Sequence, residues 1–158
     1  MTGVAFSATG ELIVLDSDEN VSAVCWRDPT SSRRDLASGY ELLRASDEPR
    51  QQFVAALRAL GTDDEEVGLG GPLFAQGQVL AAVVERERWI GGHLGWQSAA
   101  LVFLDIQTGE WLGFLELPGA EHHQPILLRN GIICQGVEER TRVARWLPPA
   151  LPPHRRVR

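Results

Sequence analysis

The sequence contains no lysine and only two cysteines, Cys25 and Cys134, so several kinds of site have no basis here. All fifteen basic residues are arginines. Without a lysine the chain cannot carry a P-loop, whose lysine reaches the nucleotide phosphates. Two cysteines far apart in the sequence, with no CxxC pair, do not predict a zinc site built on thiols. We therefore expect two buried thiols and no metal.

Long apolar runs are also absent. No stretch of about 18 uncharged apolar residues occurs, so we expect no membrane-spanning helix. The residues Met1 to Phe6 include no basic start followed by a long apolar stretch, so no secretory signal is expected and the cytoplasm is the default location. At 158 residues and 44% apolar content, the chain is predicted to bury a core within one domain.

Charge is distributed unevenly along this acidic protein. The first 138 residues hold nine arginines against twenty acidic residues, whereas from Glu139 onward there are six arginines and one acid. An acidic body repels a phosphate backbone, which disfavours nucleic acid as a partner. The same acidity favours a basic protein partner. The basic end could also bind the acidic body of another copy, which leaves homo-oligomerisation open.

Strand patterns dominate the chain. The clearest is the stretch from Leu101 to Leu117, in which two apolar runs flank a Thr-Gly turn and predict a β-hairpin. Further strands are expected between Val4 and Trp26, and a second hairpin closes at Asn130-Gly131. We predict one mainly β domain over residues 1–147, built of antiparallel sheets. Residues 148–158 hold four prolines in six residues and are predicted to be a disordered tail.

One amphipathic helix is predicted near residues 47–60, inserted between strands. Ser46 is a candidate N-cap, and Gly61 is a stop signal. The apolar residues of this segment fall on one face at helical spacing; they are Phe53, Val54, Leu57 and Leu60. Just before this segment, residues 40–43 are expected to form a short strand.

Two hairpin segments match motifs of a known family. Pro72, Gly77 and Val79 fit the pattern P-x-x-x-x-G-x-V, and the later run Leu104-Asp105-Ile-Gln-Thr108-Gly109 fits the start of L-D-x-x-T-G-x-x-x-W. Together they resemble the blades of quinoprotein-type (PQQ-like) β-propellers, over about a third of the chain. Trp111 falls two residues before the family's tryptophan, and no cofactor-binding residue can be matched, so we expect no cofactor.

The resemblance implies blade-like sheets of antiparallel hairpins. Too few blades are present for a closed ring, which needs about four or more. Three arrangements stay open: a propeller completed between chains by oligomerisation, a subunit that docks on another propeller, or an unrelated compact β domain.

The segment from Trp89 to Gln97 is the best candidate for a site. It combines three glycines with two tryptophans and a histidine, and it is expected to be a loop. Trp89, His93 and Trp96 would offer stacking surfaces and one polar group to a ligand or a partner. Alternatively, the segment simply connects two strands, and its tryptophans cover the edge of the core.

Other polar clusters do not match a site signature. The segment Glu121-His122-His123-Gln124 lacks the HExxH spacing of a zinc helix and is expected to be a solvated loop. Asp16 to Asn20 resembles the start of a calcium loop but lacks the glycine and glutamate that follow in that motif. Ser98 lacks the second glycine of a nucleophile elbow. We therefore name no catalytic residue.

The functional hypothesis depends partly on the absence of any recognisable catalytic signature. A mainly β domain without a catalytic constellation favours a non-enzymatic protein-interaction module, as a subunit of a larger assembly or an inhibitor of a basic partner. The competing hypotheses are a small-molecule or sugar binder or hydrolase that uses the segment 89–97, and a partial propeller completed by oligomerisation.

Overall fold

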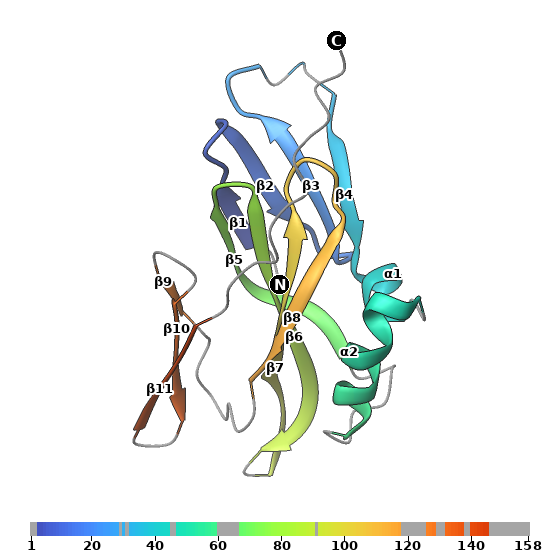
Figure 1. Ribbon diagram of the computed structural model, residues 1–158, viewed down its shortest axis with the longest axis vertical. Coiled ribbons are helices and arrows are strands. Elements are labelled where there is room, and N and C mark those ends of the chain that lie inside the picture. The colour runs from blue at the N-terminus through green and yellow to red at the C-terminus, as the bar shows by residue number, and fades with distance from the viewer. Residues whose placement is uncertain are drawn as a thin grey trace.

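The structure is a computed structural model and describes residues 3–28, 30, 32–44, 47–59, 67–90, 92–117, 126–128, 132–137 and 140–145. As predicted, it is mainly β: the described residues contain three antiparallel sheets and two helices (Figure 1). The predicted tail, 148–158, and the segment 121–124 lie outside them. Neither of the two helices in the described ranges is long and apolar enough to cross a membrane.

The first sheet is a meander in which each strand pairs with the next, in the order β1-β2-β3-β4. The turn between β2 and β3 is closed by Asp16, whose Oδ1 accepts hydrogen bonds from the backbone N–H groups of Asp18 and Asn20. An acidic residue therefore serves as a turn former here. The strands are β1 (Gly3–Phe6), β2 (Glu11–Leu15), β3 (Asn20–Cys25) and β4 (Arg34–Ser38).

The second sheet is also a four-stranded meander, in the order β5-β6-β7-β8. Its turn between β7 and β8 confirms the predicted Thr-Gly hairpin. Asp105 Oδ1 accepts hydrogen bonds from the N–H groups of Gln107 and Thr108 at 2.7 and 2.9 Å, and Gly109 takes the positive φ of 73° that this turn requires. The strands are β5 (Val67–Gln76), β6 (Val79–Ile90), β7 (His93–Asp105) and β8 (Trp111–Glu116).

The third sheet has the order β11-β10-β9. Leu128 pairs with Ile132 across the predicted Asn130-Gly131 turn, so the second predicted hairpin is confirmed in its strand pairing. The strands are β9 (Ile126–Leu128), β10 (Ile132–Val137) and β11 (Arg140–Arg145).

The predicted helix is confirmed as α2 (Glu48–Ala59). Its first turn begins at Asp47, whose carbonyl accepts hydrogen bonds from the N–H groups of Arg50 and Gln51. Phe53 and Leu57 are buried, as their spacing predicts. Ser46, Leu60 and Gly61 lie outside the described residues.

The predicted strand at residues 40–43 is wrong, because this segment belongs to a second helix, α1 (Gly39–Arg44). Tyr40 and Glu41 are both exposed, whereas the next two residues, Leu42 and Leu43, are both buried. Pairs of adjacent residues on the same side are typical of a helix, since a strand alternates at every residue. The strand that precedes it, β4, was not predicted.

The main core lies between the first two sheets and beneath α2. The β1 strand runs beside β5, so the two meanders meet at their first strands (Figure 1). Phe53 of α2 contacts Trp111 and Phe114 of β8, with ring centroids 5.2 Å apart in each pair. The core residues contributed by the two sheets are less than about a tenth exposed; they include Ile13, Leu15, Val21, Ala23, Leu80, Ala82, Val84, Ala100, Val102 and Leu104.

Hydrogen bonds link the first sheet to the second. Arg34 of β4 donates hydrogen bonds to the carbonyls of Ile106 and Gln107, at 2.8 and 2.7 Å, in the turn between β7 and β8. In the same turn, Gly109 lies so close to the carbonyl of Leu36 that a Cβ would clash with it. The glycine of the Thr-Gly motif therefore serves the packing of two sheets as well as the turn.

The second sheet has an apolar cluster on its other face as well. Ala81, Val83, Leu101 and Phe103 are at most 1% exposed. Strand alternation places them opposite the residues that face the first sheet. The second sheet is therefore buried on both faces.

Candidate interaction surface

The first sheet presents two different faces, which the strand register defines. Ala5 pairs with Ile13, and Ile13 pairs with Ala23, so these residues share the inner face, which packs on the second sheet. The neighbouring positions in each strand point the other way. We call this second side the outer face; its residues are Val4, Phe6, Leu12, Val14, Ser22, Val24 and Asp35.

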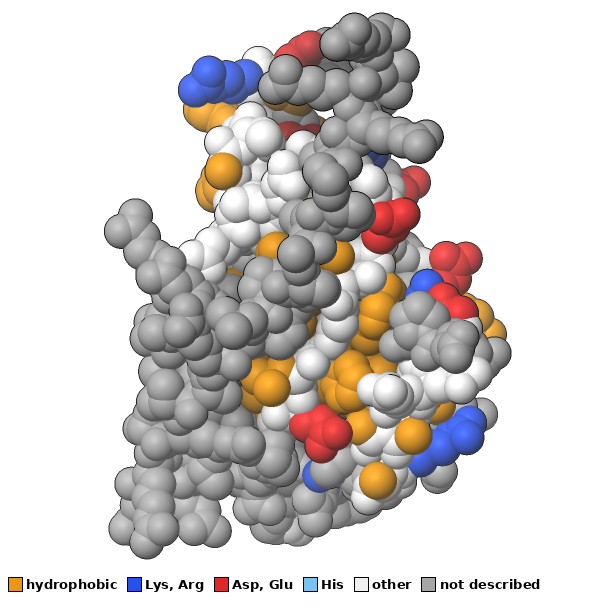
Figure 2. All heavy atoms as spheres, in the orientation of Figure 1, with side chains coloured by type: hydrophobic (Ala, Val, Ile, Leu, Met, Phe, Trp, Pro, Cys, Tyr) orange, Lys and Arg blue, Asp and Glu red, His pale blue; other side chains and the backbone are white. Residues whose placement is uncertain are grey.

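The outer face is largely apolar over β1, β2 and β3; its β1 part is open, whereas Ser22 of β3 is only 1% exposed. Val4 and Phe6 are 61% and 65% exposed, and Leu12, Val14 and Val24 are half-buried. An exposed apolar patch of several neighbouring side chains is unusual on the surface of a monomeric protein and commonly marks a site of contact with a partner. Figure 2 shows one side of the molecule, on which apolar side chains gather along β8 and, in a smaller group, over the first sheet.

An exposed indole lies at one end of this face. Trp26 directly follows β3 and is 55% exposed, and its Nε1 would lie 3.9 Å from a Cβ at Gly10 in the turn between β1 and β2. The Arg27 guanidinium lies 5.7 Å from the centre of the indole ring. Exposed aromatic side chains, tryptophan above all, are among the residues that most often anchor a protein partner.

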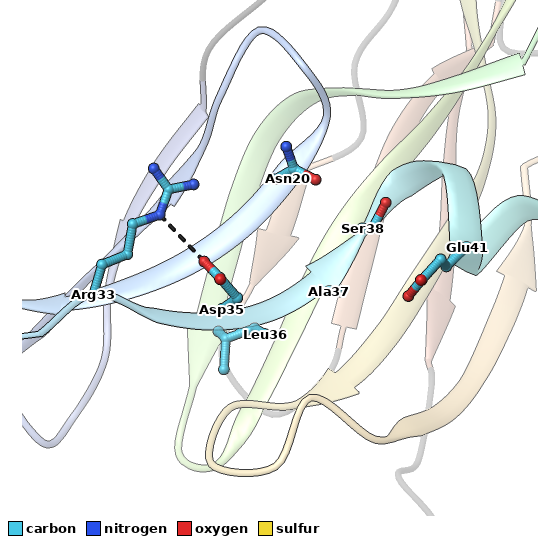
Figure 3. A pocket seen from close by; sticks show the side chains of 7 residues that line it. All are labelled: Asn20, Arg33, Asp35, Leu36, Ala37, Ser38 and Glu41. Atoms are coloured by element: carbon cyan, nitrogen blue, oxygen red, sulfur yellow. Dashed lines mark ion pairs between the residues drawn. The ribbon is translucent and has the colours of Figure 1, made fainter.

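The other end of the outer face is hollowed into a polar groove of about 620 Å³. In Figure 3 the side chains of Asn20, Arg33, Asp35 and Ser38 all stand on one side of the sheet, and Leu36 points to the opposite side. The groove thus continues the outer face across β3 and β4 to the first turn of α1. Its lining residues are Asn20, Arg33, Asp35, Leu36, Ala37, Ser38 and Glu41.

The groove carries more negative than positive charge. Arg33 forms ion pairs with Asp16 at 2.9 Å and with Asp35 at 3.3 Å, so one cation serves two carboxylates. The backbone N–H of Asn20 and then Arg33 hold the pKa of Asp16 below its usual value, so this carboxylate stays ionised at neutral pH. Glu41 is exposed and has no ion-pair partner among the residues that the structure describes. The groove therefore suits positively charged groups.

The segment predicted as a site, 89–97, is not a loop. Trp89 lies in β6, and His93 and Trp96 lie in β7, so the segment is a hairpin with only residues 91 and 92 between its strands. The prediction of a loop is wrong because the two glycines allow a two-residue turn, and the flanking residues can then continue the pairing. Gly92 takes the positive φ, 88°, that such a turn needs.

The hairpin places two of the three predicted positions on one face. Glu87 pairs with Trp96, Trp89 with Leu94 and Ile90 with His93, so positions 89 and 96 share a face of the ribbon and position 93 falls on the other. The Trp96 side chain is 51% exposed. The side chains of Trp89 and His93 lie outside the described residues. The hairpin tip is at the bottom of Figure 1, away from the groove beside β4.

The remaining polar candidates serve as structural elements where the structure describes them. Asp16 forms the turn between β2 and β3, and Cys25 is a free, half-buried thiol. Ser98 is buried in β7, where it pairs with Glu85. Within the described ranges no group of three or more histidine, cysteine, aspartate or glutamate side chains could hold a metal ion.

Sequence reasoning did not single out the outer face, although one signal for it was present. Strand β2 reads Leu-Ile-Val-Leu, which is apolar on both sides. A strand that faces water on one side normally alternates apolar and polar residues, so an unbroken apolar run predicts that both faces are covered. The groove gave no such signal, because its residues come from three elements. No family model, curated protein or solved structure matches this chain.

Proposed function

We propose that the protein is a non-enzymatic interaction module that docks a basic protein partner on the outer face of its first sheet. The observation that carries the proposal is an apolar sheet face with Val4 and Phe6 more than half exposed, next to an acidic groove. A protein interface typically combines an apolar centre with a polar rim, and this surface offers both.

Electrostatics supports a basic partner. The chain has a formal net charge of −6, and the exposed carboxylates of Asp35 and Glu41 rim the apolar part of the face. Complementary charge accelerates encounter and disfavours wrong partners. The apolar side chains would then supply most of the affinity, since exposed ion pairs contribute little.

The stacking of the sheets supports a place within a larger assembly. Two four-stranded meanders follow one another in the chain, and the first strands of the two run side by side. Successive propeller blades are also four-stranded antiparallel sheets arranged around an axis. On this second proposal, the outer face would receive a further blade supplied by another chain.

The test is capture of partners from the native host with matched variants. We expect Val4→Ser combined with Phe6→Ser to reduce recovery of a co-purifying protein at least tenfold, because the apolar contact is lost. The control is Trp96→Ser, which removes an aromatic side chain of similar exposure from the hairpin of β6 and β7. Recovery should be unchanged in that control.

The reverse result would overturn the proposal. If Trp96→Ser abolishes recovery and the double variant retains it, the contact site is the hairpin 89–97. Native mass spectrometry tests the second proposal by measuring the oligomeric state, because ring completion between identical chains requires an oligomer. A stable monomer at micromolar concentration contradicts ring completion between identical chains and leaves only a blade supplied by a different protein.

A further inference from the structure

The acidic groove has a candidate occupant within the chain itself. Residues 148–158 contain Arg155, Arg156 and Arg158 and no acidic residue. We propose that this segment folds back onto the outer face of the first sheet in the same molecule and competes there with the basic partner. The inference rests on the proposed function for its consequence, but the contact itself can be tested without a partner.

Charge complementarity is the first argument. Arg33, the cation of the groove, is already shared between Asp16 and Asp35, and the Asp35 side chain is 83% exposed. Additional guanidinium groups would therefore meet carboxylates whose charge is only partly balanced. Arginine suits such a site because its planar guanidinium can donate two parallel hydrogen bonds to one carboxylate.

The composition of the segment matches the rest of the face. Its four prolines favour the extended polyproline II conformation, which loses little conformational entropy on binding. Proline-rich segments characteristically dock on surfaces lined by aromatic side chains. The outer face and its end provide Phe6 and Trp26, both more than half exposed. In the segment, the prolines come first and the arginines follow. The prolines could therefore lie against the aromatic part of the face while the arginines reach the acidic groove at its other end.

The chain is long enough for this contact. Strand β11 ends at Arg145, and 13 residues follow it. Fully extended, they span about 45 Å. A domain of this size has a radius of gyration of about 15 Å, so a segment of that reach can extend across the molecule.

A tethered segment needs little intrinsic affinity. A short flexible connection gives an effective concentration of about 1 mM. With an intrinsic Kd of about the same size, the segment would occupy the face about half of the time. Removing it would then strengthen partner binding about twofold, and a tighter contact would give a larger gain.

The experiment uses the full chain and amide NMR. The variant carries Arg155→Gln, Arg156→Gln and Arg158→Gln. We expect the amide signals of Asn20, Asp35 and Ser38 to shift relative to the wild type, while those of the hairpin around Trp96 stay in place. Added salt should move the wild-type groove signals toward the variant positions, because exposed ion pairs are screened.

A second variant tests the groove side. Asp35→Asn combined with Glu41→Gln should produce the same loss of contact, and further replacement of the three arginines should then change little. The matched control is Glu87→Gln with Glu116→Gln, which removes two charges from the second sheet. In that control, replacement of the arginines should shift the groove signals as in the wild type.

Each outcome decides the proposal. Unchanged groove signals in the arginine variant would overturn it, whether or not a partner binds to the face. Shifts that grow with protein concentration would also overturn the contact within one molecule and assign the segment to a second copy. Shifts independent of concentration, lost in the groove variant and retained in the control, support it.

Discussion

The first and second sheets have the same topology but differ in how much of each is covered. Both are four-stranded antiparallel meanders. The second has buried apolar clusters on both faces, whereas the first has such a cluster only on its inner face and leaves Val4 and Phe6 exposed on the other. Strand β2 is nonetheless apolar on both sides. The outer face of the first sheet therefore carries apolar side chains, Val4 and Phe6, that no described part of the chain covers.

The contrast also separates stability from recognition. Residues between the sheets contribute to folding because burial removes their apolar area from water. Val4 and Phe6 on the outer face gain little from folding, since they stay exposed. On the function proposed above, their apolar character serves binding. Substitutions in the two regions should therefore change different properties.

The largest expected effect compares two phenylalanines. Phe103→Ala in the second sheet should lower the free energy of unfolding by about 3–5 kcal/mol, because it leaves a cavity in a buried cluster. Phe6→Ala on the outer face should lower it by less than about 0.5 kcal/mol. Urea denaturation of both variants measures the difference. An equal loss would mean that the outer face is covered in the folded chain, and the comparison would fail.

A smaller effect tests the contact between the two sheets. Gly77 and Gly109 both take positive φ, 60° and 73°, but only Gly109 lies against the backbone of Leu36; nothing lies within 4 Å of a Cβ at Gly77. Gly77→Ala should cost about 1–2 kcal/mol through backbone strain. Gly109→Ala should cost about 1–3 kcal/mol more, since the added methyl group pushes the sheets apart. Equal costs in thermal denaturation would show that the sheets do not meet at this turn.

The smallest effect is a pH dependence that arises in the second sheet. Burial raises the pKa of the Glu85 carboxyl above its ordinary value of 4.5. The contribution of this group to stability is fully present below pH 4.5 and is lost as the pH rises through the higher pKa of the folded state. Glu85→Gln should remove this decline from the stability profile measured by denaturation between pH 4 and 7.

The exposed Glu116 provides the control for that profile. Glu116→Gln should leave the decline in place, because this side chain of β8 is open to water. If Glu85→Gln and the wild type decline in parallel, the carboxyl of Glu85 is solvated in the folded protein. The second sheet would then be less completely buried than the first comparison requires.

Local patterns were enough to predict much of the fold. The hairpin around Thr108 and Gly109 was predictable because an aspartate, a threonine and a glycine at this spacing close a turn with their own hydrogen bonds. Helix α2 was predictable from the spacing of Phe53 and Leu57. Both signals depend only on neighbours in the chain.

The errors occurred where a neighbour in space decides the conformation. Helix α1 begins at Gly39, whose N–H donates to the carbonyl of Glu19, and the Glu19 carboxylate in turn accepts a hydrogen bond from the N–H of Leu69 in β5. These contacts join α1, the turn between β2 and β3, and β5, so the residues around position 40 do not by themselves predict them. The hairpin at 89–97 was mistaken for a loop because glycine is equally compatible with a two-residue turn and an irregular segment.

The β class, the Thr-Gly turn and the amphipathic helix followed from the sequence alone, because each depends on side-chain periodicity or on hydrogen bonds within a few residues. Which apolar face is buried, which is open and which polar side chains gather in the groove became known from the folded structure. Burial depends on what packs against a face, and that is set by contacts between segments far apart in the chain. Residues such as Asn20, Asp35 and Glu41 meet only when separate strands and a helix are brought together.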